Sequence, residues 1–385
     1  MLEFEAGQLM ESPCVIFVAN RGYALTSSRG SLIQRFLSAG WIVVVATADD
    51  PESQSLRDLG AHLEPVCFNR GGVAPVADVR AWRRMSQIYR IWQPVLIHQF
   101  HAKPVIFGSL AARGATRGAC QVVNTITGLG RTFISSGVSA GLAGLGYGFA
   151  LSHTACTIFQ NRDDRALFLE HGWVSEPQTK LITGSGVDTR KFSVAERRGR
   201  DGSAPTVVML GRLLRQKGIP EFAEVAGRIR GRWPAARFLL AGELDPDHPD
   251  AVTEEWLREQ EGIEYLGQLT DVVPVLEQAD LFLFPSYYRE GVPRVILEAS
   301  ATGLPTVGFD VPGVREAVRD GETGYLVPNR DLDALTDRVE ELLKDESLRL
   351  VMGRAARQLA VESFDVRAIE AQYLQIYRDL GLDIE

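Results

Sequence analysis

The sequence predicts an α/β protein made of two doubly wound parallel-sheet domains in succession. Short apolar runs alternate with amphipathic segments in the first half of the chain, and the same alternation restarts after Pro205. The length of 385 residues fits this division, since one domain usually has roughly 150 residues. Each half therefore reads as a complete unit of strands joined by helices.

The elements expected in the first half begin with a buried strand near the start of the chain. Its expected strands are Val15–Ala19, Ile42–Ala46, Val95–His98 and Val122–Thr125, and its clearest helices are Ser31–Ala39 and Arg80–Trp92. The second half has expected strands at Thr206–Leu210, Arg237–Ala241, Ile263–Tyr265, Leu281–Pro285 and Thr306–Phe309, with helices at Ile219–Arg232 and Pro293–Thr302.

A polar, glycine-containing segment, residues 191–205, has the composition of a linker. We therefore expect an N-terminal Rossmann-like domain at residues 1–190 and a C-terminal one at residues 191–364. The last segment, 365–385, is expected to form a helix that packs back towards the N-terminal domain. Ligands bind beyond the carboxyl ends of parallel strands, so a cleft between the two domains is the expected binding site.

The composition argues against a membrane-spanning or secreted chain. The longest apolar segment, Gly137–Ala150, is shorter than the ~18 residues that cross a bilayer, and the start of the chain lacks the basic residues of a signal peptide. The four cysteines form no CxxC pair, so a zinc site is not indicated. We expect a cytoplasmic protein whose only membrane contact is peripheral, on the inner face of the cell membrane.

Charge is distributed unevenly along the chain. No acidic residue occurs between Asp78 and Asp163, whereas nine lysines and arginines lie there. One face of this region should therefore attract anions. Within it, Arg80–Trp92 interleaves aromatic and aliphatic residues with four arginines, which fits either a helix at a membrane surface or an ordinary packed amphipathic helix.

Two segments of the second half carry the chemistry. In the first, Gly211-Arg-Leu-Leu-Arg-Gln-Lys217-Gly218 follows a buried strand, and its two cations Arg212 and Lys217 suit a diphosphate. In the second, a strand leads through Glu290 into a helix that begins near Pro293, ends before Gly303 and contains Glu298. The N-terminus of such a helix can bind phosphate.

These segments together resemble the retaining glycosyltransferases of family 4, which have the two-domain GT-B fold. The resemblance rests on Gly-Arg…Lys-Gly, on two glutamates eight positions apart, and on three further segments, Gly184–Asp188, Val311–Glu316 and Gly321–Pro328. It implies that Arg212 and Lys217 bind the diphosphate of a UDP-sugar. It also implies that Glu298 binds the ribose, that Glu290 binds the transferred sugar, and that Gly291, Val292 and Pro293 border the phosphates.

The acceptor side is expected in the first half, where His101-Ala-Lys103-Pro and Asn124–Gly130 resemble enzymes that extend sugars on polyprenyl diphosphates. His101, Lys103 and Thr127 are candidates, with a purely structural histidine as the alternative for His101. Thr127 stands where the family often has a histidine. Arg29 and Gly30, just before the helix expected from Ser31, could form an anion seat or a simple turn.

The sequence thus predicts a retaining, metal-independent hexosyltransferase that moves a hexose or N-acetylhexosamine from a UDP-sugar to a lipid-diphosphate-linked glycan. A soluble acceptor, a sugar-nucleotide epimerase of the same fold and a non-catalytic binding subunit are the alternatives. Gly128-Leu-Gly130 lacks the third glycine of a dinucleotide site, and Asp245-Pro-Asp247 follows a strand in a setting that does not favour a metal. No cofactor or nucleic-acid partner is expected.

Overall fold

The computed structural model describes residues 12–69, 74–116, 120–130, 138–194, 204–246 and 248–384. The chain forms two compact units, the first made of Met1–Ser185 with Ile369–Glu385 and the second of Gly186–Ala368. The division falls at Ser185–Gly186, ahead of the polar segment 191–205 in which the sequence placed it. Residues 191–194 belong to the second unit, where Phe192 is buried in the core, and 195–203 lie outside the described residues.

The first unit is a parallel sheet covered by helices on both faces. Its strands are β1 (Cys14–Val18), β2 (Ile42–Thr47), β3 (His62–Pro65), β4 (Leu96–Phe100), β5 (Gln121–Ile126), β6 (Cys156–Phe159) and β7 (Thr179–Leu181). Its helices are α1 (Gly22–Ser38), α2 (Pro51–Asp58), α3 (Pro75–Trp92), η2 (Pro104–Gly108), α4 (Ser109–Ala115), α5 (Val138–Leu151), α6 (Arg162–Glu170), η4 (Glu176–Gln178) and the last helix, α14 (Val366–Asp379).

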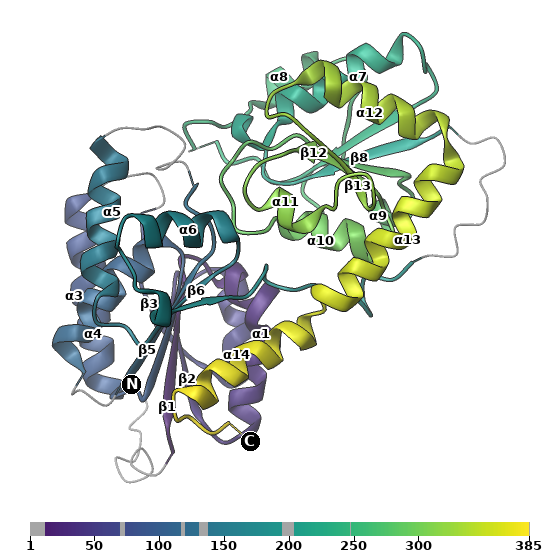
Figure 1. The fold of residues 1–385 in the computed structure, drawn as a ribbon. Helices are drawn as coiled ribbons and strands as arrows, with labels where there is room; N and C mark the ends of the chain where they lie inside the picture. The colour runs from purple at the N-terminus through teal and green to yellow at the C-terminus, as the bar shows by residue number, and fades with distance from the viewer. Residues whose placement is uncertain are drawn as a thin grey trace. The chain divides into compact units, whose positions relative to one another are not determined.

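The strand order β3-β2-β1-β4-β5-β6-β7 makes this sheet doubly wound. Alternate residues of β1 serve opposite faces, as a strand with both faces buried requires. Val15 and Phe17 join the core beneath α1 and α14, whereas Ile16 and Val18 join the core beneath α3 and α4. In Figure 1, α1 and α14 accordingly lie on one side of the sheet and α3, α4 and α5 on the other.

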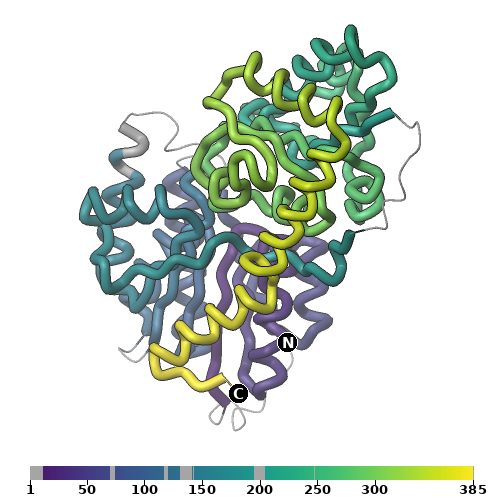
Figure 2. Tube along the Cα trace, turned by 45° about the vertical axis from the view of Figure 1, so that its right-hand side comes forward, coloured from purple at the N-terminus to yellow at the C-terminus, as the bar shows by residue number. Residues whose placement is uncertain are grey.

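Helix α14 belongs to the core of the first unit although it comes last in the chain. Figure 2 shows its yellow tube running beside the purple tube of α1. Phe36 of α1 meets the ring of Tyr377 edge to face, with 5.6 Å between the ring centroids. Ile369, Tyr373 and Ile376 are buried in the same cluster, so residues from both extremes of the chain share one core.

The second unit repeats the architecture. Its strands are β8 (Thr206–Leu210), β9 (Arg237–Ala241), β10 (Glu264–Tyr265), β11 (Leu281–Phe284), β12 (Thr306–Phe309) and β13 (Gly324–Val327). Its helices are η5 (Arg215–Lys217), α7 (Ile219–Arg230), α8 (Glu254–Glu259), α9 (Val273–Glu277), α10 (Arg294–Ala301), α11 (Val314–Ala317), α12 (Leu332–Lys344) and α13 (Glu346–Ser363).

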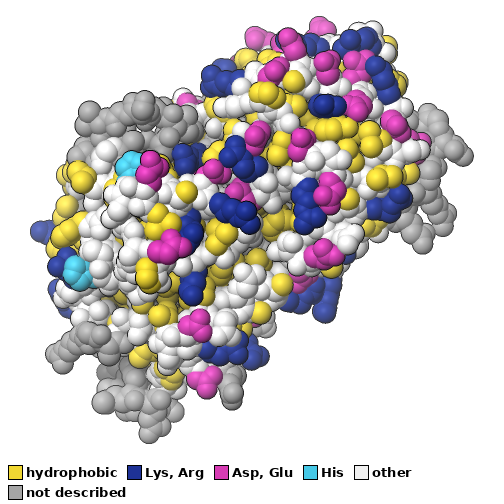
Figure 3. Space-filling view, in the orientation of Figure 1, with side chains coloured by type: hydrophobic (Ala, Val, Ile, Leu, Met, Phe, Trp, Pro, Cys, Tyr) yellow, Lys and Arg dark blue, Asp and Glu magenta, His cyan; other side chains and the backbone are white. Residues whose placement is uncertain are grey.

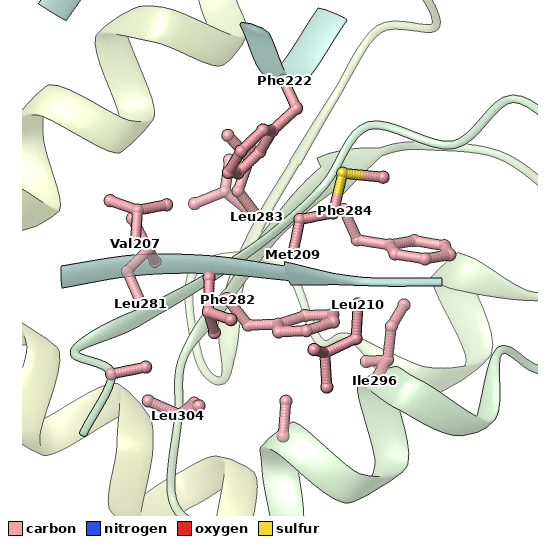
Figure 4. Packing of buried hydrophobic residues seen from close by; sticks show 14 of the residues in the cluster. Val207, Met209, Leu210, Phe222, Leu281, Phe282, Leu283, Phe284, Ile296 and Leu304 are labelled. Carbon is pink, nitrogen blue, oxygen red and sulfur yellow. The ribbon is translucent and has the colours of Figure 1, made fainter. Parts of the chain in front are cut away.

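This second sheet is also parallel, in the order β10-β9-β8-β11-β12-β13. Apart from Thr206 at the start of β8, its two central strands, β8 and β11, consist of apolar residues because both of their faces are covered. Figure 4 shows Met209 and Leu283 on the side of Phe222 from α7, and Leu210 and Phe282 on the side of Ile296 from α10. The sheet therefore holds the ends of β8 and β11 rigidly beside each other.

Within the described ranges, no helix is both long and apolar enough to cross a bilayer.

Candidate functional site

The central strands of the second unit, β8 and β11, lie side by side at the point where the strand order reverses. At such a switch point the loops that follow the two strands diverge to opposite faces and leave a crevice at the sheet edge. The loop after β8 carries Arg212 and Lys217, and the loop after β11 carries Glu290. The topology thus assembles residues that are more than 70 positions apart in the sequence.

These two loops are joined through their backbones. The amide of Tyr287 donates to the carbonyl of Gln216 at 3.2 Å. Gly218, at a φ of +85°, lies so close to the other loop that a Cβ there would stand 2.1 Å from the carbonyl oxygen of Pro285. Only glycine combines that conformation with that approach. The position of Lys217 relative to Glu290 is therefore fixed by main-chain contacts on both sides.

Lys217 and Glu290 form an ion pair, with 2.6 Å between Nζ and Oε1. The lysine is buried, and its ammonium also lies 5.1 Å from the centre of the Tyr288 ring. Burial lowers the pKa of Lys217, attraction and hydrogen bonding to Glu290 raise it, and repulsion from Arg212 lowers it. Both cations predicted from the sequence thus lie in the loop after β8, and Lys217 is paired across to the loop after β11.

Arg212 is held from its other side by Asp245, with 3.4 Å between Nη1 and Oδ2. Asp245 is buried in the loop after β9. The sequence drew attention to it only as half of an Asp-Pro-Asp motif, and the second half, Asp247, lies outside the described residues. Its contact with Arg212 had no signal in the sequence, because the two residues are joined by the fold and not by a motif.

The loop after β11 passes through Gly291 and Val292 to Pro293, which caps α10. A Cβ on Gly313, in the loop after β12, would lie 2.2 Å from the carbonyl oxygen of Gly291, so this neighbouring loop supports the turn closely. The amino end of α10, with its partial positive charge, follows directly. The helix runs from Arg294 to Ala301, and Gly303 has a φ of +76°, which agrees with the predicted stop.

Glu298 lies inside α10 and is buried, contrary to the behaviour of an ordinary surface glutamate. Its Oε1 accepts a hydrogen bond from Nε of Arg294, one turn earlier, at 2.8 Å. Burial raises the pKa of Glu298, whereas Arg294 and Lys191 lower it. A carboxylate held in this way is a fixed hydrogen-bond acceptor within the helix, one turn after Arg294.

The structure corrects the prediction for Arg29 and Gly30 in the first unit. Helix α1 begins at Gly22, not near Ser31, so the two residues lie inside the helix and not at its amino end. Arg29 is only 3% exposed. It donates to the hydroxyl of Tyr373 at 2.8 Å and to the carbonyl of Ser185 at 3.2 Å, and it stacks on Phe100. The helix-terminus argument for an anion seat therefore fails.

The other acceptor candidates follow β4 and β5. His101 has a left-handed φ of 72°, and burial together with Arg29 lowers its pKa to about 4. Lys103 is engaged by Asp78 of α3, with 2.7 Å between Nζ and Oδ1. Thr127 comes directly after β5 and is half-buried. Their contacts thus differ, and no interaction among the three is found in the described part of the chain.

His98 has a structural environment. His98 lies on β4 and its ring is buried. Its Nδ1 is hydrogen-bonded to the hydroxyl of Tyr377, and its Nε2 is hydrogen-bonded to the hydroxyl of Thr125 at 2.8 Å. The described residues contain no group of three or more His, Cys, Asp and Glu side chains arranged to hold a metal ion. The charges around β8 and β11 are instead those of two cations, each paired with a carboxylate: Lys217 with Glu290 and Arg212 with Asp245.

Two family models match this chain. Residues 14–161 match a glycosyl transferase 4-like model, and residues 204–345 match the model of glycosyl transferases group 1. Two doubly wound sheets with these matches define a glycosyltransferase of the GT-B fold. The chain belongs to the family-4 type within that class.

Its relatives agree with this assignment. The chain is 28% identical over 375 residues to the N,N'-diacetylbacillosaminyl-diphospho-undecaprenol alpha-1,3-N-acetylgalactosaminyltransferase of Campylobacter jejuni, covering 94% of this chain and 97% of the relative. Sucrose-phosphate synthase from Thermosynechococcus elongatus has the same fold, with a TM-score of 0.77, 21% identity and coverage of 96% and 99%. So does Anabaena HepE in complex with UDP-glucose, with a TM-score of 0.74, 18% identity and coverage of 96% and 99%.

Proposed function

We propose that this glycosyltransferase moves a hexose or N-acetylhexosamine from a UDP-sugar to a glycan carried on a polyprenyl diphosphate, with retention of anomeric configuration. The observation that carries the proposal is the meeting of Lys217, from the loop after β8, with Glu290, from the loop after β11, with Arg212 in the same loop as Lys217. The relative from Campylobacter jejuni is named for a diphospho-undecaprenol acceptor and aligns over nearly its full length, which supports the acceptor class and a role in glycan assembly. The UDP-glucose complex of HepE supports the donor class.

The chemistry assigned to these residues is stabilisation of the leaving group. The acceptor hydroxyl attacks the anomeric carbon on the face from which the nucleotide departs, the carbon–oxygen bond to the diphosphate breaks, and the hydroxyl proton passes to the departing diphosphate. Arg212 and Lys217 neutralise the charge that develops on that group. Because both are held in place before reaction, little reorganisation accompanies the chemical step.

The two glutamates are assigned to the donor on either side of the diphosphate. Glu290 already contacts Lys217, so a sugar hydroxyl bound to its carboxylate would lie beside the leaving group. Glu298, fixed by Arg294, is assigned to the ribose hydroxyls, and the backbone from Gly291 to Pro293 to the phosphates. The two cations take the role that a divalent ion has in other transferases, so activity should persist in EDTA.

The test is a screen of UDP-glucose, UDP-galactose, UDP-N-acetylglucosamine and UDP-N-acetylgalactosamine against three acceptors. These are a short-chain polyprenyl diphosphate carrying one sugar, the same sugar free in solution, and water. Mass spectrometry detects transfer, and NMR of the product gives the anomeric configuration. We expect transfer to the lipid-linked sugar, an equatorial anomeric proton in the product as in the α-linked donor, and full activity in EDTA.

Other outcomes would redirect the assignment. Transfer to the free sugar at an equal rate would contradict the lipid-linked acceptor. A new sugar nucleotide formed from donor alone would identify an epimerase, and an inverted product would contradict the front-face mechanism. The matched control is Lys217→Met, which should abolish transfer from whichever donor is used, so that a contaminating enzyme is recognised.

A further inference from the structure

The outer surface of the first unit, on the side of the sheet away from α1 and α14, combines exposed apolar side chains with exposed arginines. Helix α3 buries Ala81, Met85, Ile88 and Tyr89 against the sheet and leaves its other side exposed. We call the exposed side of α3 and its neighbours the α3–α5 face. It consists of Val76, Val79, Arg80, Trp82, Arg83, Arg90 and Ile91 from α3, Arg113 from α4, and Leu145 and Phe149 from α5.

Four apolar side chains of this face have most of their surface in contact with solvent. Val76 and Ile91 are each 67% exposed, Leu145 is 69% exposed and Phe149 is 62% exposed. Single exposed apolar residues are common, but Leu145 and Phe149 stand four positions apart on one side of α5. Arg113 of α4 stacks on the Phe149 ring at 5.2 Å, so the residues of α4 and α5 form one continuous surface.

The exposed charge on this face is positive. Arg80, Arg83 and Arg90 are exposed along α3, and Arg113 is exposed on α4. Two acids of the first unit are engaged by other residues, since Asp78 of α3 binds Lys103 and Glu64 of β3 binds both Arg84 and Trp92. Figure 3 shows the result at the left edge of the first unit, where yellow and dark blue side chains stand together without magenta ones.

We propose that the α3–α5 face docks on an anionic lipid surface. Its arginines would meet the headgroup phosphates, and Val76, Ile91, Leu145 and Phe149 would enter the boundary between headgroups and acyl chains. Interleaving favours this occupant over a protein partner, because protein interfaces separate an apolar centre from a polar rim. The helix α3 spans about 27 Å along this surface, which allows several headgroups to be contacted at once.

This inference rests on the proposed function, because a lipid-linked acceptor is presented at such a surface. The inference adds a second binding partner, the anionic lipid surface, and names the residues that contact this surface. It also accounts for the sequence pattern, because the acid-free segment between Asp78 and Asp163 supplies most of α3 and all of α4 and α5. The alternatives left open for Arg80–Trp92 are thereby reconciled, since one side of the helix packs on the sheet and the other is free for lipid.

The experiment is co-sedimentation of the full chain with two kinds of vesicle, phosphatidylcholine alone and phosphatidylcholine with about one third phosphatidylglycerol. We expect binding to the anionic vesicles and little to the neutral ones. Arg83→Gln with Arg90→Gln should weaken binding roughly 25-fold, since each basic residue near an anionic surface strengthens binding about fivefold. The matched control, Arg354→Gln with Arg378→Gln, changes the net charge equally at exposed arginines elsewhere and should bind as the wild type does.

A second pair tests the apolar component. Ile91→Asn with Leu145→Asn should also weaken binding to anionic vesicles, whereas Val351→Asn with Val361→Asn, at exposed valines of α13, should not. Equal binding to both kinds of vesicle, or unchanged binding by Arg83→Gln with Arg90→Gln, would overturn the proposal. All variants should retain normal transfer to a short-chain acceptor free of vesicles. Loss of transfer to every acceptor in a wild-type chain that still binds vesicles would instead contradict the proposed function alone.

Discussion

In the second unit, the loop after β8 holds two cations at the sheet edge, and one of them, Lys217, pairs with Glu290 from the loop after β11. In the first unit, which has the same order of central strands, Arg29 and His98 are enclosed by the rings of Phe100, Tyr373 and Tyr377. One scaffold thus uses its ionisable side chains in two ways. Those on glycine-tightened loops form an ion pair at the ends of the strands, and those on the strand and helix themselves are enclosed in the core.

The difference teaches where charge is available for binding. Lys217 and Glu290 form an ion pair between two loops at the carboxyl ends of the strands. Arg29 already has the Tyr373 hydroxyl, the Ser185 carbonyl and two aromatic rings. An anion arriving at Arg29 would have to replace all of them. The four predictions below challenge or sharpen this contrast, beginning with the largest effect.

Replacing Lys217 by Met should lower turnover about 100- to 1000-fold, because removing a preorganised group that meets developing charge costs about that much. Steady-state kinetics with the preferred UDP-sugar measure it. The reference is Glu290→Gln, which removes the partner carboxylate. The double variant combines Lys217→Met with Glu290→Gln. If the lysine acts on the donor, the turnover of this double variant should be lower than that of Glu290→Gln by a similar factor. Equal turnover in these two chains would mean that Lys217 serves only to neutralise Glu290.

Replacing Gly218 by Ala should lower the free energy of unfolding by about 2 to 3 kcal/mol, since the new methyl would meet the Pro285 carbonyl at a positive φ. The loops that hold Lys217 and Glu290 would separate, so donor binding should weaken as well. Urea denaturation measures the stability. Gly227→Ala, in open space on α7, is the control and should stabilise by about 0.5 to 1 kcal/mol. A similar loss for both would remove the argument from loop contact.

The free energy of unfolding should depend on pH through the buried His101 of the first unit. The pKa of His101 is lowered to about 4, so the folded chain resists a proton that the unfolded chain accepts near 6.5. Its contribution is therefore present above pH 6.5 and is lost as the pH falls towards 4. Between pH 7 and pH 5 the wild type should lose about 2 kcal/mol more unfolding free energy than His101→Gln. Parallel pH profiles for the two chains would show that this ring titrates as if exposed.

Replacing Asp245 by Asn should have the smallest effect. Arg212 would keep its charge but lose the carboxylate that orients it at 3.4 Å, a loss of about 1 kcal/mol or roughly fivefold in the KM for the donor. The value of kcat should change less. Asp333→Asn, which removes an exposed carboxylate paired with Arg228, is the control. An unchanged KM for Asp245→Asn would mean that Arg212 is oriented by the donor alone.

The sequence could predict the second unit better than the first for a physical reason. The two cations and Glu290 sit in loops bounded by glycine and proline at strand ends, and such loops are recognisable locally. Arg29 lies on the same side of α1 as Leu25, Ile33 and Phe36, but its cation leaves the apolar pattern incomplete, and the helix start at Gly22 was missed. Its partner Tyr373 lies 344 residues further along the chain, beyond the reach of any local pattern.

The other contacts also differ in how far the sequence could predict them. The resemblance assigned Lys217 and Glu290 to neighbouring parts of one donor, but their direct ion pair was not predicted. Asp245 could not be assigned to Arg212, because a loop after a neighbouring strand can turn in many directions. The exposed side of α3 could be suspected from its arginines, but only the packing of its other side on the sheet distinguishes the two surfaces.

The path of α14 has a consequence for the order in which the protein is built during translation. The second unit is one continuous stretch, 186–368, and all its strands have been synthesised before residue 369 is added. At that moment the first unit still lacks Tyr373 and Tyr377. Arg29 and His98 therefore cannot yet form their hydrogen bonds to these two hydroxyls. The half that is synthesised first is therefore the half that is finished last, and a nascent chain halted before residue 369 exposes the uncovered core beside α1.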